Sequence, residues 1–96
     1  MTEAATMELR LLFHSIHNVM LAEELLLAND IPTDMLPVPR ELSSDCGMCL
    51  AGYWRDLARI KACFANQPFT SPILIYRFMR RKATVGPECE LLLTIP

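Results

Sequence analysis

The apolar residues of this chain change their spacing several times, and the order of these changes limits the folds open to it. Residues 8–13 form a short apolar run that is typical of a central strand. From Ser15 onward the apolar residues recur at intervals of three and four, which predicts a helix capped by Ser15 and ended at Asn29-Asp30. Residues 34–38 are expected to form a strand at a sheet edge, because Pro37 cannot donate a ladder hydrogen bond.

The second half of the chain repeats this pattern. Residues 48–52 are a short apolar run that predicts a third strand, and residues 54–66 carry one apolar stripe, which predicts a second helix. Residues 72–78 are rich in β-branched and aromatic side chains and are the strongest strand signal. The order β-α-β-β-α-β predicts an α+β, ferredoxin-like sandwich, with two helices on one face of an antiparallel sheet and the third strand between the first two.

We treat residues 1–96 as one domain, with a core over 8–78 and a C-terminal extension over 79–96. The extension contains Arg80-Arg81-Lys82, which form the basic cluster of the chain together with Arg77, and it ends in an apolar segment over 91–95. Three alternatives are open for this segment: an edge strand of the sheet, a strand that pairs with a second subunit in a homodimer, or a mobile tail.

Composition narrows the classes of function and location. The apolar runs are far shorter than the roughly 20 residues of a membrane helix, so we expect no membrane partner. Residues 1–6 contain no basic segment followed by an apolar one, and the four cysteines are expected to be reduced thiols, so the expected location is the cytoplasm. The net charge of −2 and the single basic cluster argue against a nucleic-acid partner.

The loop between the second and third predicted strands contains the only stretch whose residues indicate a reactive site. Its prolines stiffen the approach, and a Ser-Ser-Asp cluster can turn the chain. Gly47 permits a positive φ directly after Cys46. We therefore predict an accessible Cys46 thiol at the apex of a tight turn, whereas Cys49 begins an apolar run and can point inward.

The predicted topology brings the start of the first helix to the same end of the sheet as this loop. Cys46 is therefore expected near His14, Ser15 and His17. The helix N-terminus with either histidine, or alternatively Arg40, would lower the pKa of the Cys46 thiol and so favour the nucleophilic thiolate.

Other chemistries of the same residues remain open. Cys46 and Cys49 are spaced as one zinc or iron–sulfur knuckle, which His14 and His17 could complete, or as a disulfide switch. A further alternative is that they are two small buried apolar side chains. Cys63 lies on the apolar stripe of the second helix and is expected to pack in the core.

Four motifs stand out in these segments: Phe13-His14-Ser15-x-His17, Ala22-Glu23, Ile31-Pro32 and Pro37-x-Pro39-Arg40-Glu41-Leu42-Ser43-Ser44-x-Cys46-Gly47. Together they resemble the selenium/sulfur carrier-like domain family of small bacterial domains. The resemblance covers about residues 8–78. The chain lacks the Cys-Pro-x-Pro motif of TusA-type sulfur carriers, with which these domains are associated.

The resemblance implies a carrier without substrate turnover of its own and without a cofactor or metal. Cys46 would hold a persulfide or perselenide, and Cys49 would be the resolving thiol. The residues that frame the carrier cysteine would be Pro39, Arg40, Ser43, Ser44 and Gly47. Expected partners are a cysteine desulfurase or similar sulfur or selenium donor and a TusA-type relay protein. The alternative is a small interaction module that uses the Cys-x-x-Cys to bind a metal or to form a redox switch.

Overall fold

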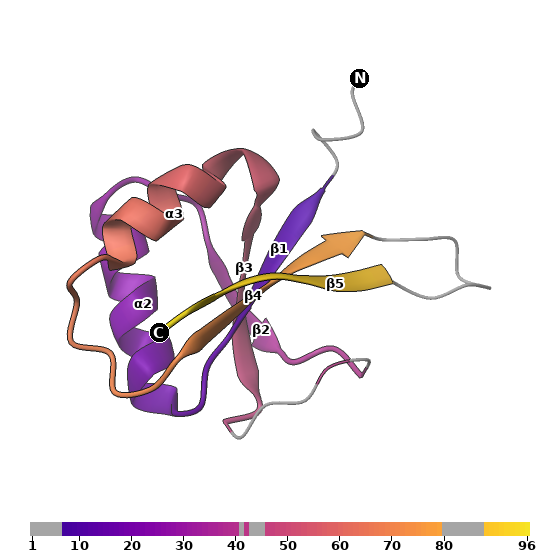
Figure 1. Ribbon diagram of the computed structural model, residues 1–96, viewed down its shortest axis with the longest axis horizontal. Helices are drawn as coiled ribbons and strands as arrows, with labels where there is room; N and C mark the ends of the chain where they lie inside the picture. The colour runs from indigo at the N-terminus through magenta and orange to yellow at the C-terminus, as the bar shows by residue number, and fades with distance from the viewer. Residues whose placement is uncertain (1–6, 41, 43–45, 80–87) are drawn as a thin grey trace.

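The computed structural model describes residues 7–40, 42, 46–79 and 88–96, and Figure 1 shows their arrangement. The elements in chain order are β1 (Glu8–Leu12), α2 (Ile16–Ala28), β2 (Asp34–Pro37), β3 (Met48–Tyr53), the 3-10 turn η1 (Trp54–Asp56), α3 (Leu57–Phe64), β4 (Ile73–Met79) and β5 (Glu88–Ile95).

The five strands form one antiparallel sheet in the order β2-β3-β1-β4-β5. The α+β class is confirmed, and β3 lies between β1 and β2 as predicted from the right-handed crossover. The sheet has one strand more than the predicted sandwich, because β5 is added beyond β4. The topology is therefore not strictly ferredoxin-like.

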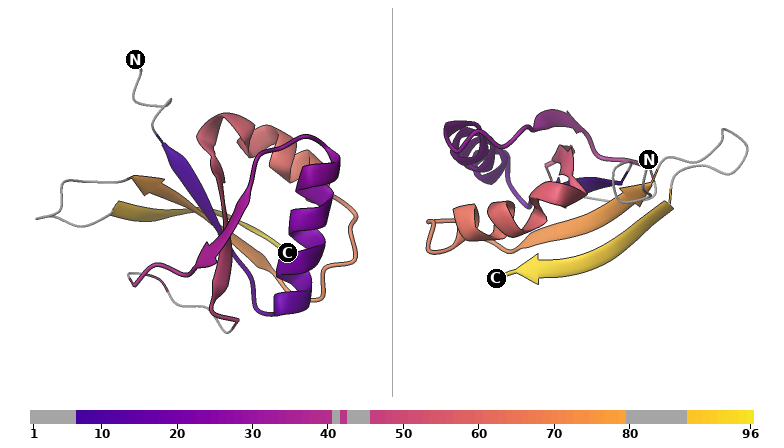
Figure 2. Two further views of the ribbon diagram at one scale, coloured as in Figure 1. Left: turned by 180° about the vertical axis from the view of Figure 1, so that it is seen from behind. Right: turned by 90° about the horizontal axis from the view of Figure 1, so that it is seen from above.

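The core lies between the helices and one face of the sheet. Leu11 of β1 stands opposite Leu50 of β3 and Ile75 of β4, and all three are buried together with helix residues such as Val19 and Phe64. Strand side chains alternate between faces, so these partners define the helix side of the sheet. Figure 2 shows α2 and α3 on the same side of the strands. The prediction that both helices cover one face is confirmed.

The helices begin and end close to the predicted residues. The Ser15 hydroxyl accepts a hydrogen bond from the Asn18 N–H at 3.2 Å and caps α2, as predicted. The second helix is shorter than predicted: residues 54–56 form a 3-10 turn, and α3 ends at Phe64, two residues before Asn66 adopts a φ of 60°. Among the described residues, neither helix combines the length and the apolar run that crossing a membrane would take.

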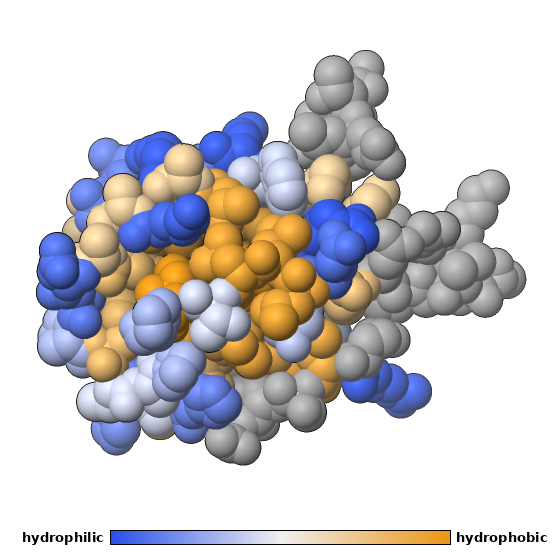
Figure 3. All heavy atoms as spheres, viewed as in Figure 1, coloured by the Kyte–Doolittle hydropathy of each residue, from blue (hydrophilic) through white to orange (hydrophobic). Residues whose placement is uncertain are grey.

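The C-terminal segment is an edge strand, the first of the three alternatives. β5 pairs with β4 along seven residue pairs, with an irregularity at Leu92, and the Arg77 guanidinium donates to the Glu90 carboxylate at 3.1 Å. Figure 3 shows an apolar surface at the centre of the face along which β5 runs in Figure 1. Of the predicted basic cluster, Arg77 lies in β4, and residues 80–82 lie outside the described residues.

Candidate functional site

Cys46 lies at the base of the β2–β3 loop. The last paired residues of the two strands are Pro37 and Met48, and Val38 donates its N–H to the Gly47 carbonyl at 3.1 Å just beyond them. Cys46 therefore sits one residue outside the closed end of the hairpin. The sequence predicted the thiol at the apex of a tight turn, and Cys46 does lie in a turn beside Gly47, at the base of the loop.

The backbone around Gly47 directs the Cys46 side chain back towards the sheet. Gly47 has a φ of 75°, a conformation that residues with a side chain rarely adopt, and it is exposed. The half-buried Cys46 thiol contacts the Met48 carbonyl oxygen at 3.1 Å and the Phe13 carbonyl oxygen at 3.4 Å. It also packs against the core cluster. Both neighbouring oxygens are acceptors, so the thiol donates in these contacts, and they orient its side chain towards the start of α2.

The contact with Phe13 places Cys46 beside the residues that lead into α2. His14 and His17 are both exposed there, and Ser15 serves as the helix cap. The expected proximity of the loop cysteine to the start of the first helix is confirmed, although the contact runs through the backbone carbonyl of Phe13, which sequence reasoning did not identify. A carbonyl gives no sequence signal, because every residue has one.

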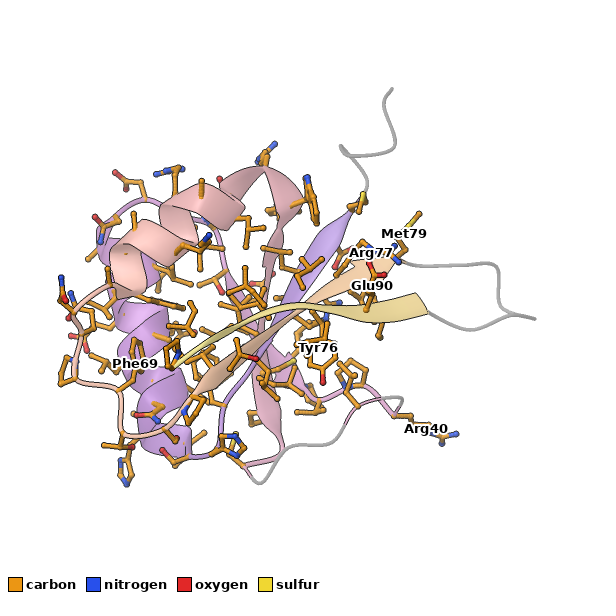
Figure 4. The ribbon with its side chains drawn as sticks, viewed as in Figure 1. Arg40, Phe69, Tyr76, Arg77, Met79 and Glu90 are labelled. Carbon is orange, nitrogen blue, oxygen red and sulfur yellow. The ribbon has the colours of Figure 1, made fainter. Side chains whose placement is uncertain are left out.

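The framing residues are only partly described. Pro39 is half-buried and its carbonyl accepts the Leu42 N–H at 3.0 Å, which makes a turn at this point of the loop. Arg40 is exposed, and Figure 4 shows its side chain pointing outward from the loop and away from the sheet. Ser43 and Ser44 lie outside the described residues.

Cys49 is enclosed within the sheet layer. Its exposed fraction is 0%, and its thiol lies 3.7 Å from the Pro37 carbonyl. Leu50, the next residue of β3, points to the helix side, so Cys49 points to the opposite face, where it stands opposite Leu12 and Leu36. Cys46 packs against the helix-side core. The two cysteines of the motif thus approach the sheet from different sides.

A buried arginine near Cys49 was missed in the sequence. Arg10 lies on the same face as Cys49, is 3% exposed, and donates to the Glu8 carboxylate at 2.8 Å and to the Leu9 carbonyl at 3.1 Å. Its guanidinium stands 4.0 Å from the centre of the Phe78 ring. The strand alternation predicts only that Arg10 points away from the helices; its burial follows from contacts that are distant in sequence.

Burial raises the pKa of the Cys49 thiol above its ordinary value of 9.0; the positive charge of Arg10 opposes this shift, and Cys46 adds to it. A raised pKa means that the unfolded chain loses this proton first. The stabilisation of the folded state by the protonated Cys49 thiol is therefore complete below pH 9.0. It is lost as the pH rises from there through the pKa of Cys49 in the folded state.

We expect the free energy of unfolding to decrease above pH 9.0, and to decrease less in Cys49→Ala than in the unchanged chain. Urea titrations on both sides of this pH measure the effect. Cys63, whose pKa burial also raises, contributes in the same direction in both proteins and cancels from the comparison. Parallel pH profiles for the two proteins would contradict the assignment to Cys49.

The other cysteines and the cavities lie elsewhere. Cys63 packs against the core as predicted, with its sulfur 3.5 Å from the Leu25 carbonyl oxygen. Cys89 lies in β5. A surface depression of about 390 Å³ is lined by Thr33, Gly52 and other residues at the far end of β3 from Cys46. In the described part of the chain, no three His, Cys, Asp or Glu side chains are gathered to hold a metal ion.

Comparison with known proteins adds one finding. Residues 8–71 match the family described as "Putative Se/S carrier protein-like", a match that extends from β1 to just before β4 and includes the whole β2–β3 loop. No curated protein and no solved structure shows significant similarity to the chain. The match covers two thirds of the chain, with Cys46 and the start of α2 inside it and β5 outside it. The chain therefore belongs to the Putative Se/S carrier protein-like family.

Proposed function

We propose that this protein carries a sulfur or selenium atom between partner proteins as a persulfide or perselenide on Cys46. The observation that carries the proposal is the position of Cys46: a half-buried thiol beside the start of α2, within the region that matches the family. A carrier needs its sulfur reachable by two successive partners. A thiol at the base of a surface loop meets this need, and one inside the sheet does not.

The loading step is a thiol exchange that needs no external oxidant. The Cys46 thiolate attacks the terminal sulfur of a persulfide on the donor, and a new bond forms between this sulfur and Cys46. The sulfur–sulfur bond of the donor breaks, and the donor cysteine leaves as a thiolate. Unloading is the same step with a thiolate of the acceptor as the attacking group. The proton of the Cys46 thiol, which faces the carbonyls of Phe13 and Met48, must leave before the attack.

In this proposal Cys49 is part of the sheet and takes no part in the transfer. A resolving thiol has to reach the persulfide sulfur, and Cys49 is fully enclosed on the face of the sheet opposite to the core against which Cys46 packs. Reaction between the two cysteines would require β3 to leave its neighbours. The same geometry disfavours a disulfide switch between Cys46 and Cys49.

We propose that the donor is a cysteine desulfurase or a similar enzyme that presents a persulfide. The acceptor would be a TusA-type relay protein. His14 and His17 are both exposed near Cys46, so a partner that reaches the sulfur meets them as well. We propose that these histidines assist the proton transfer, since a neutral imidazole ring has one nitrogen that can accept a proton.

Intact mass measured after incubation with a cysteine desulfurase and cysteine tests the proposal. We expect a gain of one sulfur atom, about 32 Da, that a reductant reverses, because the adduct is a persulfide. Cys46→Ser should gain nothing, whereas Cys49→Ala should load like the unchanged chain. Cys63→Ala is the matched control, since Cys63 is half-buried like Cys46 but lies between the two helices.

Loading that persists in Cys46→Ser would contradict the proposal. Loss of loading in Cys49→Ala, with the fold intact by circular dichroism, would restore Cys49 as a resolving thiol. A selenium donor in place of cysteine distinguishes the two elements through the larger mass gain.

A further inference from the structure

The two edges of the sheet are built differently. β2 has four residues, ends at Pro37 and follows Pro32 by two positions, so prolines bracket this short edge. β5 has eight residues and contains no proline. Among the described residues no strand lies beyond β5, so the outer edge of β5 pairs with no other strand in that part of the chain. The protected edge is β2, and the edge open to pairing is β5.

β5 also exposes apolar side chains on both faces of the sheet. Leu91 is 50% exposed on the face away from the helices, where it stands opposite Tyr76. Leu92, Leu93 and Ile95 are only partly buried where they pack against the helix-side core. The apolar surface in Figure 3 lies along this strand.

The irregularity in β5 sets which face each residue occupies. Leu91 pairs with Tyr76 and Leu93 with Ile75, which leaves Leu92 as the extra residue of a β-bulge. Before the bulge, the side chains alternate between the two faces, with Leu91 on the face away from the helices. After the bulge they alternate again, with Leu93 on the helix side. Leu91 and Thr94 therefore face away from the helices, whereas Glu90, Leu93 and Ile95 face the helix side.

The geometry points to a homodimer in which β5 pairs antiparallel with the same strand of a second copy, about a two-fold axis between Leu92 and Leu93. This axis joins two five-stranded sheets into one and places all four helices on the same side. It sets Leu91 opposite the partner's Thr94, and Leu92 opposite the partner's Leu93. Each such pair lies on one face, because the bulge shifts the second half of the strand by one residue. An axis at Glu90 would place the two Glu90 carboxylates opposite each other. An axis at Leu91 would pair residues that lie on different faces of the sheet.

The charges of β5 fit the same axis. Glu90 meets the partner's Ile95, so the two Glu90 carboxylates are separated by five residue positions along the paired strands, about 17 Å. Each Glu90 already receives a hydrogen bond from Arg77 within its own chain. Two copies of Leu92 and Leu93 meet at the centre of the interface, where charge is absent. The strand is thus complementary to itself, which is the requirement for a two-fold interface.

This inference is independent of the proposed carrier function. Cys46 and β5 lie in separate parts of the fold, and the family match ends at residue 71, before β4 and β5. A chain that dimerises without accepting sulfur, or that accepts sulfur as a monomer, separates the two proposals.

Disulfide cross-linking tests the register of the two strands. We expect the variant Leu91→Cys with Thr94→Cys, in a Cys89→Ser background, to form a reducible dimer in which peptide mapping finds residue 91 joined to residue 94 of the other copy. Leu91→Cys alone is the matched control, since the two copies of residue 91 are offset by about 10 Å along the strands, beyond the reach of a disulfide. Equal cross-linking of both variants would overturn the register.

Light scattering after size exclusion tests the interface itself. The unchanged chain should be dimeric, and Leu91→Lys should dissociate at a concentration at least tenfold higher, because a lysine on an edge strand opposes pairing. Met20→Lys makes the same change at an exposed site on α2 (57% exposed) and should leave the dimer intact. A monomeric unchanged chain at every concentration, including one that pairs only with a different protein, would overturn the proposal.

Discussion

An alkylating reagent should modify Cys46 of the native protein on the order of a thousandfold faster than Cys49. Cys49 lies within β3, between β2 and β1, with no exposed surface, and its raised pKa leaves less reactive thiolate. Its reaction must wait for the strands to separate, and an opening that costs about 4 kcal/mol slows it roughly a thousandfold. Cys46 is half-buried outside the paired strands, and its contacts with the carbonyl oxygens of Phe13 and Met48 can be displaced without separating the strands.

A time course of iodoacetamide labelling with peptide mapping measures the difference. Cys63 and Cys89, which are both half-buried, serve as internal comparisons and should react at rates between the two extremes. In urea the four rates should become similar, because burial no longer distinguishes the residues. Comparable labelling of Cys49 and Cys46 under native conditions would show that β3 opens readily, and would reopen a resolving role for Cys49.

This contrast between the two cysteines was only half visible in the sequence. The spacing Cys46-x-x-Cys49 favours a paired function, such as a metal knuckle or a redox pair. The apolar run that begins near Cys49 indicates a strand, and the alternation of that strand turns Cys49 away from the helices. The direction of Cys46 depends on the φ of Gly47 and on the carbonyl of Phe13, 33 residues earlier. Only the folded chain supplies both.

The helices and strands themselves were largely predictable, because the spacing of the apolar residues and the residues that cap or end each element indicated the same boundaries. Ser15 caps α2 as expected, and Pro37 lies in an edge strand. The fate of residues 88–95 could not be fixed in the same way. Three successive leucines at 91–93 show no alternation of apolar and polar residues, so the sequence does not indicate which face each one occupies. The bulge at Leu92 places two of them on one face. An edge strand can also pair within one chain or between chains.

The buried Arg10 presents the second large expected effect. Its stem and guanidinium occupy space beside Phe78, and its charge is met by Glu8, whose side chain is 24% exposed. Arg10→Ala empties this space, and we expect it to destabilise the protein by about 2–4 kcal/mol, as for other large buried side chains. The Glu8 carboxylate that remains is partly hydrated, so the cost arises mainly from lost packing.

Arg10→Met separates packing from charge. Methionine has a similar length, and its sulfur makes a favourable contact with an aromatic ring such as that of Phe78. Arg10→Met leaves the Glu8 carboxylate without this partner, but Glu8 is 24% exposed and water can hydrate it, so we expect Arg10→Met to lie within about 1.5 kcal/mol of the unchanged chain. Urea unfolding of both variants provides the measurement. If Arg10→Met proved as unstable as Arg10→Ala, the charge of Arg10 rather than its volume would stabilise the sheet face that encloses Cys49.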